Sequence, residues 1–112
     1  MTLDEYQRRA RETALYPRHA RVLYPSLKLA GEAGEVTEKL GKLIRDEGYV
    51  PGTDLSEAQR DALAKELGDV LWYVANLAAD LGMPLDTVAA RNLEKLADRK
   101  QRGVIGGSGD DR

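Results

Sequence analysis

Two long stretches of the chain repeat apolar residues at alternating spacings of four and three positions. In residues 63–81 the repeat consists of Leu63, Leu67, Val70, Val74, Leu77 and Leu81. In residues 29–43 it consists of Leu29, Ala33, Val36, Leu40 and Leu43. This spacing places the repeated side chains on one face of an α-helix and is typical of helices that pack side by side. The two stretches therefore predict a pair of amphipathic helices at the centre of the fold.

Capping and helix-breaking residues divide the chain into about four main helices. Thr2 and Ser56 are followed three residues later by Glu5 and Gln59, which is the capping-box pattern of a helix start. Connectors containing proline and glycine separate the expected helices, which cover residues 3–13, 26–47, 57–81 and 84–101. The sequence therefore predicts an all-α fold, an antiparallel helical bundle. Residues 1–105 form its single domain, and residues 106–112 form a glycine-rich tail without structure of its own.

Composition excludes several classes of protein. The 112 residues suffice for one modest hydrophobic core, and a net charge of −2 offers no basic surface for nucleic acid. The absence of cysteine excludes disulfides and thiolate metal sites. No apolar run approaches the ~20 residues that span a membrane, and no signal peptide precedes the first expected helix. We therefore expect a cytoplasmic protein without a nucleic-acid or membrane partner.

Two pairs of carboxylates lie beside the apolar repeats. Glu32 and Glu35 form the first pair, and Glu66 and Asp69 form the second, each at a spacing of three residues on one side of its helix. Packing the two helices side by side would gather four acids, which repel one another unless a positive charge lies among them. Oxygen ligands of this kind suit Mg²⁺, or Mn²⁺ in its place. The four acids are therefore predicted metal ligands.

Glycines flank the first pair of acids at positions 31 and 34. Each glycine costs about 1 kcal/mol in a helix interior relative to alanine. Two interpretations stay open: a ligand or another helix approaches the backbone closely here, or the glycines only permit tight helix packing.

A polar and basic stripe follows on the last expected helix, at Asn92, Lys95, Arg99 and Arg102. Cations facing a carboxylate-bound metal would together favour hydrolysis of a polyphosphate, with the metal carrying the phosphates because no P-loop is present. A di-iron site is excluded, since it needs Glu-x-x-His pairs that the sequence lacks. A non-catalytic structural or interaction bundle stays open as an alternative, because paired acids are also common on exposed helix faces.

The arrangement of these motifs along the chain resembles the MazG-type, all-α nucleoside triphosphate pyrophosphohydrolases. The resemblance rests on residues 3–7, 24–36, 66–74, 92–96 with Arg99, 102–103 and 107–110. It centres on an E-x-x-E motif at Glu32 and Glu35 and an E-x-x-D motif at Glu66 and Asp69. The related phosphoribosyl-ATP group has a histidine soon after its E-x-x-D motif, and this chain does not.

The resemblance implies hydrolysis between the α- and β-phosphates of an NTP or dNTP, in a house-cleaning role for the nucleotide pool. The four acids would hold Mg²⁺. Lys95 and Arg99 would contact the phosphates, and Asn92 would contribute to the substrate pocket, with Lys39 as a further candidate for substrate binding. Family members associate as homodimers or dimers of dimers, so we expect homodimerisation to complete the bundle.

The hypothesised mechanism is attack of a water molecule on the α-phosphate. Glu35, or alternatively Glu66, would orient that water as the catalytic base. Trp72 and Asn76 are candidates for the base pocket, together with Tyr16 and His19. For Trp72 taken by itself, packing in the core or in a subunit interface is favoured over contact with a base. The tail could close over the phosphates through Arg112.

Overall fold

In the computed structural model, which describes residues 1–112, all regular structure is helical. The elements are α1 (Leu3–Arg11), the 3₁₀ helix η1 (Arg18–Ala20), α2 (Leu23–Glu47), α3 (Glu57–Asp80) and α4 (Leu85–Arg102). The prediction of an all-α fold with four main helices is therefore confirmed. None of these helices combines the length and apolar character required to cross a membrane.

Two helices begin at the predicted capping residues. The Ser56 hydroxyl accepts from the Gln59 amide, and the Gln59 side chain accepts from the Ser56 amide, which completes the capping box of α3. The Thr2 hydroxyl caps α1. The predicted start of α2 at Ser26 was wrong by three residues. Pro25 lies in the first turn, where a helix tolerates the missing N–H, and the Ser26 hydroxyl donates to the carbonyl of Val22.

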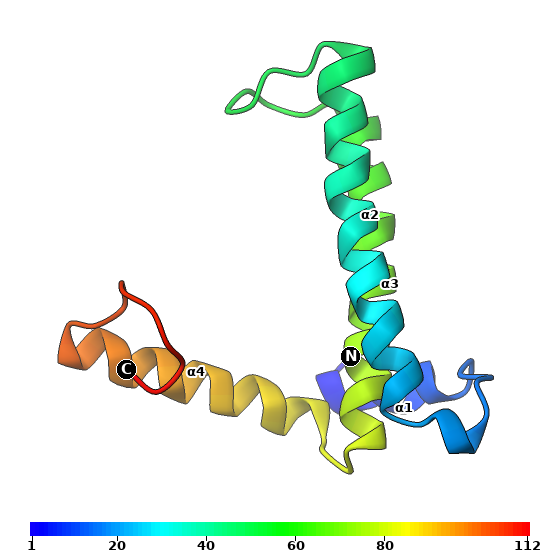
Figure 1. The fold of residues 1–112 in the computed structure, drawn as a ribbon, viewed down its shortest axis with the longest axis vertical. Helices are drawn as coiled ribbons and strands as arrows, with labels where there is room; N and C mark the ends of the chain where they lie inside the picture. The colour runs from blue at the N-terminus through cyan, green and yellow to red at the C-terminus, as the bar shows by residue number, and fades with distance from the viewer.

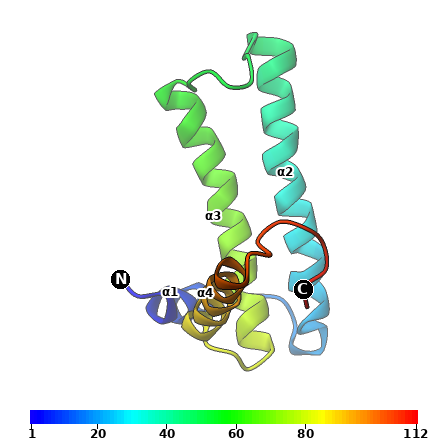
Figure 2. The same cartoon turned by 90° about the vertical axis from the view of Figure 1, so that its left-hand side faces the viewer.

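The antiparallel pair α2–α3 is the longest feature of the molecule (Figures 1 and 2). The two helices pack against each other along this pair, and Leu43 is the one buried leucine of the two apolar repeats. Coverage of the α3 repeat is incomplete, because Leu67 and Leu81 are 57% and 61% exposed. The repeat thus predicts the helix and its main face, but one chain does not bury all of it.

α1 and the start of α4 cross the base of the hairpin, where the small core lies. Ala10, Ala75, Ala78 and Leu85 form this core. The buried Gln7 side chain donates to the carbonyls of Ala75 (3.1 Å) and Met83 (3.0 Å) and accepts from the Leu85 amide (3.0 Å). A helix N-terminus has N–H groups without partners in the helix, and Gln7 satisfies one of these for α4. One side chain of α1 therefore joins α3 to α4.

α4 leads away from the hairpin instead of packing along it (Figures 1 and 2). The radius of gyration is 17.0 Å, whereas a compact domain of this length would have about 13 Å. The accessible surface is 7987 Å², against about 6,100 Å² expected for a folded monomer of this mass. A closed four-helix bundle is thus not formed within one chain.

Candidate active site

Three carboxylates of the α2–α3 hairpin meet at one point. Glu32 lies on α2, and Glu66 and Asp69 lie one turn apart on α3. Each offers an oxygen within 4.8 Å of the oxygens offered by the other two. Glu32 and Glu66 are half-buried, and Asp69 is exposed. We call these three residues the acidic triad.

The other two predicted residues on α2 lie beside the triad without joining it. Glu35 is exposed on the next turn of the helix and is not among the converging carboxylates. Lys39, one turn further on, places its Nζ 2.8 Å from Oε1 of Glu66. Its ammonium group supplies one positive charge beside three negative ones, which leaves the group with a net negative charge.

The donor set of the triad fits a hard divalent cation. All three ligand atoms are carboxylate oxygens, which Mg²⁺ and Mn²⁺ prefer. Mg²⁺ binds its ligands at about 2.0–2.1 Å, so two of them lie at most about 4.2 Å apart. The observed spread of up to 4.8 Å is slightly wider. Small side-chain movements would therefore be enough to close the triad around such an ion.

The glycines beside the triad are not explained by packing within one chain. A Cβ atom added at Gly31, Gly34 or Gly68 would meet no atom within 4 Å. The close approach predicted at positions 31 and 34 is therefore not made by any element of the same chain. The backbone next to the triad is accessible to a ligand or to a second chain.

An open pocket of about 380 Å³ adjoins the triad. Glu32 and Asp69 line it together with Thr13, Trp72 and Tyr73. A neighbouring pocket of about 390 Å³ shares the last three of these residues, and most of its lining is aromatic or apolar. The Trp72 indole donates from Nε1 to the Thr13 hydroxyl (2.8 Å) and meets Tyr73 edge-on. Trp72, a predicted base contact, thus lies between the acidic triad and an aromatic surface.

Tyr73 is a protonated phenol beside the triad. Burial, the Tyr24 hydroxyl and the carboxylates of Glu32 and Asp69 raise the pKa of the Tyr73 phenol to about 12. The phenol therefore stays protonated at neutral pH and is a neutral hydrogen-bonding group beside the carboxylates. Sequence reasoning did not assign Tyr73 to the site.

Asn76, the second predicted base contact, is fully buried. Its amide donates to the carbonyl of Trp72 (3.0 Å), and its oxygen accepts from Arg11 (3.2 Å). A nucleotide base could reach Asn76 only after these groups had moved. In the structure, Asn76 supports the pocket wall instead of lining it. His19, another candidate for the base pocket, is exposed in η1.

A polar network that sequence reasoning missed holds the α1–α2 connector against α3. The buried carboxylate of Asp80 accepts from Arg11 (2.9 Å), the Tyr16 hydroxyl (2.8 Å) and the Val22 amide (3.0 Å). Burial by itself raises the pKa of Asp80, but these three hydrogen bonds outweigh it and lower the pKa below its usual value. The connector carries Thr13 and Tyr16, so the network fixes one wall of the aromatic surface. Its one sequence signal is a row of polar residues along one side of α3, at Glu66, Asp69, Tyr73, Asn76 and Asp80.

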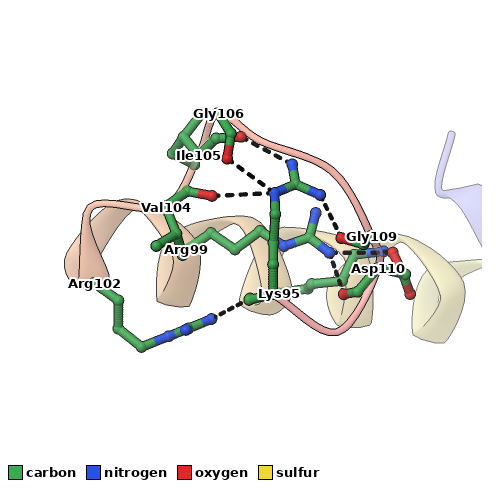
Figure 3. Close-up of polar contacts among 9 residues, drawn as sticks. Lys95, Arg99, Arg102, Val104, Ile105, Gly106, Gly109 and Asp110 are labelled. Atoms are coloured by element: carbon green, nitrogen blue, oxygen red, sulfur yellow. Dashed lines mark hydrogen bonds and ion pairs between the residues drawn. The ribbon is translucent and has the colours of Figure 1, made fainter.

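The predicted phosphate contacts lie on α4, the helix that leads away from the hairpin. Asn92 and Lys95 border an open pocket of about 330 Å³, and Arg99 is buried. Figure 3 shows that the tail folds back along α4, so that Asp110 meets both Lys95 and Arg99. The prediction of a tail without structure was therefore wrong. Arg112, expected to reach the phosphates, donates instead to backbone carbonyls of residues 104–109.

Comparison with known proteins identifies the family. The family model described as MazG nucleotide pyrophosphohydrolase domain matches residues 25–104, a range that contains the acidic triad, Lys39 and the cations of α4. The chain belongs to this family. It is also 47% identical over 118 residues to the Gene 37 protein of Mycobacterium phage L5, with 100% of both chains covered. No solved structure matches the chain.

Membership of the MazG family confirms the resemblance predicted from the sequence. It supports nucleotide pyrophosphohydrolase activity at the level of the family. Members generally depend on a divalent metal, and the acidic triad is the group of side chains in this chain that suits one.

Proposed function

We propose that this chain hydrolyses a nucleoside or deoxynucleoside triphosphate at the α–β phosphate bond, in a Mg²⁺-dependent reaction that serves house-cleaning of the nucleotide pool. The products would be the monophosphate and pyrophosphate. The observation that carries the proposal is the convergence of Glu32, Glu66 and Asp69 beside an aromatic pocket. A metal ion held by these carboxylates would supply the positive charge that the phosphates of a nucleotide need. The aromatic side chains would supply a flat apolar surface for its base.

The triad would hold the metal ion, with Glu35 positioned to act next to it. Bound there, Mg²⁺ would neutralise phosphate charge and make a water molecule more acidic. Glu35 lies one helical turn from Glu32 and is exposed, so its carboxylate is free to orient that water and accept its proton. Glu66, the alternative base, is already paired with Lys39. When the metal binds, the Glu66 carboxylate would serve as one of its ligands, whereas Glu35 lies outside the triad. This difference favours Glu35 as the base.

Lys39 would leave the Glu66 carboxylate and bind a phosphate of the substrate. In the structure its ammonium group pairs with Glu66. A cation bound to Glu66 would release Lys39, which could then bind a phosphate oxygen of the nucleotide. Lys39 is therefore a proposed phosphate ligand on the same helix as Glu32 and Glu35.

Homodimerisation would complete both the core and the site. The chain exposes about 1,900 Å² more than a compact monomer of its mass would, and obligate dimers bury about 2,000–5,000 Å² in total. Part of this excess is apolar surface on α4, where Leu93 is 67% exposed and Leu96 39% exposed. We infer that α4 of one protomer packs near the hairpin of its partner. Lys95 and Arg99 would then contact phosphates held at the partner's triad, and Asn92 would border the same pocket.

Replacing Lys39 by alanine is expected to separate metal binding from turnover. Without a competing ammonium group on Glu66, Mg²⁺ should bind about two- to fivefold more tightly in the absence of nucleotide, because an exposed ion pair is worth about 0.5–1 kcal/mol. Turnover should nevertheless fall, because a phosphate contact is lost. Isothermal calorimetry with Mg²⁺ or Mn²⁺ and steady-state kinetics measure the two effects.

Lys42→Ala is the matched control for Lys39→Ala. Lys42 lies on the same helix but pairs with Glu38, outside the triad. This variant should change neither property. Weaker metal binding in Lys39→Ala would contradict the proposed role of this side chain.

A pyrophosphate-release assay tests the activity. All common NTPs and dNTPs, with dUTP and nucleotides carrying damaged bases, would be incubated with the protein with and without Mg²⁺. We expect equal amounts of monophosphate and pyrophosphate from at least one nucleotide, and no turnover without a divalent metal. Absence of turnover with every nucleotide would favour the alternative of a non-catalytic interaction bundle.

A further inference from the structure

The tail (residues 106–112) is an ordered loop that lies along α4. Gly103 ends the helix with a left-handed conformation, and the chain then reverses direction. The Arg112 guanidinium donates to the carbonyls of Val104 (3.2 Å), Ile105 (2.9 Å) and Gly106 (3.0 Å), and also to that of Gly109 (Figure 3). One side chain thus satisfies carbonyls that a glycine-rich segment would otherwise leave to water.

Two glycines adopt the backbone conformations that turn the tail back toward α4. Gly107 and Gly109 have φ angles of +98° and +89°, which side-chain-bearing residues rarely adopt. A second anchor comes from α4 itself, where Arg102 donates to the main-chain oxygen of Arg112 (2.6 Å). The tail and the end of α4 therefore form one hydrogen-bonded unit.

This unit brings Asp110 to the two cations proposed to bind phosphate. Its Oδ1 lies 2.8 Å from Nζ of Lys95 and 3.2 Å from Nη2 of Arg99. The same Nη2 also donates to the backbone carbonyl of Asp110. The hydrogen bond from Lys95, followed by that from Arg99, lowers the pKa of the Asp110 carboxyl, which is therefore ionised at neutral pH. Sharing one carboxylate oxygen holds the ammonium and guanidinium groups side by side.

The exposed fractions of the two side chains show that the tail orders Arg99. The Arg99 side chain is 7% exposed, whereas that of Asp110 is 76% exposed. A long arginine side chain on a projecting helix would otherwise sample many rotamers, and a ligand that ordered it would lose affinity. Here the tail covers the arginine and fixes its orientation before any ligand binds.

Enough donors stay unused for a phosphate. Both Arg99 contacts come from Nη2, so Nε and Nη1 make no hydrogen bond, and the Lys95 ammonium uses one of its three N–H groups. By this count of donors, a phosphate would not have to replace Asp110 as the partner of either cation. This distinguishes a fixed clamp from a tail that blocks the site and must be displaced.

We propose that Asp110 is a positioning residue, which holds Lys95 and Arg99 as one pre-arranged clamp for the β- and γ-phosphates of the substrate. This inference rests on the proposed function, because the clamp has a role only if the chain binds a polyphosphate. Asp110 itself need not touch the substrate. Its contribution is to spare the substrate the cost of ordering two flexible cations.

The test compares Asp110→Ala with Asp111→Ala in the full chain. Both variants remove one negative charge from the tail, but Asp111 forms no ion pair or hydrogen bond with Lys95 or Arg99. Calorimetry with inorganic pyrophosphate and steady-state kinetics should show that Asp110→Ala weakens pyrophosphate binding and lowers kcat/KM by about ten- to hundredfold. Asp111→Ala should stay within about twofold of the wild type. Asp110→Glu, which restores the carboxylate, should recover part of the loss.

Three results would overturn the clamp. Tighter pyrophosphate binding or a lower KM in Asp110→Ala would show that the carboxylate competes with phosphate. Equal effects of the two alanine variants would show that Asp110 acts only through its negative charge and does not position Lys95 and Arg99. Unchanged pyrophosphate binding in Asp110→Ala, in a protein that hydrolyses nucleotides, would contradict the clamp but not the proposed function.

The proposed function can also fail while the clamp holds. Asp110-dependent binding of pyrophosphate in a protein that hydrolyses no nucleotide supports the clamp and removes the proposed function. If circular dichroism shows that Asp110→Ala disturbs α4, Asp110→Asn replaces it, since the amide keeps an acceptor oxygen and loses the charge. That variant should still bind pyrophosphate more weakly than the wild type.

Discussion

Asp69→Asn is expected to lower turnover by at least about a hundredfold while leaving the fold intact. The substitution removes one anionic ligand from the acidic triad, and a bound metal contributes several kcal/mol to stabilisation of the transition state. Asp69 is exposed and makes no ion pair in the structure, so helical content and thermal stability should stay close to those of the wild type. Steady-state kinetics with varied Mg²⁺, together with circular dichroism, measure both effects.

The matched control is Asp61→Asn, which makes the same chemical change at another exposed position of α3. This variant should keep full activity. Glu35→Gln adds a second comparison, because Glu35 lies outside the triad and is the proposed base. It should lose turnover without losing metal affinity. Full activity of Asp69→Asn would rule out the triad as the metal site.

Mixing two inactive variants is expected to restore activity if α4 acts at the site of the partner subunit. Asp69→Asn removes a triad ligand from the hairpin, and Arg99→Ala removes a cation from α4. A mixed dimer would hold one site in which both the hairpin and the partner's α4 are intact. Chains co-expressed with two affinity tags and purified through both should therefore show about half of the wild-type turnover per dimer.

A different pair of variants controls for this rescue. Asp69→Asn combined with Glu66→Gln places both changes in the triad, so neither site of a mixed dimer is intact and no activity should return. An inactive mixture of Asp69→Asn with Arg99→Ala would mean that α4 does not supply phosphate contacts across the subunit interface. A molecular mass of one chain in solution would also contradict such contacts.

The helices and the pairing of acids could be predicted from the sequence because both depend on local periodicity. The repeats of spacing four and three predict α2 and α3, and residues three positions apart on a helix lie on the same side. The meeting of Glu32, Glu66 and Asp69 follows from packing these two helices against each other. Glu35 does not join them, because it lies further round α2, on its exposed face.

Features that depend on contacts distant in sequence could not be predicted in the same way. Gln7 satisfies groups on α3 and at the start of α4, and its type and spacing give no sign of this. Asn76 has the polarity of a ligand contact, but its burial depends on how Arg11 crosses α3. The glycine content of the tail predicts an absence of structure. Its order comes instead from Arg102 and Arg112, whose donors replace water on the backbone.

The reaction in isotopically labelled water tests the central claim most directly. A nucleotide that is turned over would be incubated with the protein and Mg²⁺ in H₂¹⁸O, and the products would be separated and analysed by mass spectrometry. Attack of water at the α-phosphate predicts one ¹⁸O atom in the monophosphate and none in the pyrophosphate. Label in the pyrophosphate, or release of orthophosphate with a nucleoside diphosphate, would contradict hydrolysis at the α-phosphate by this site.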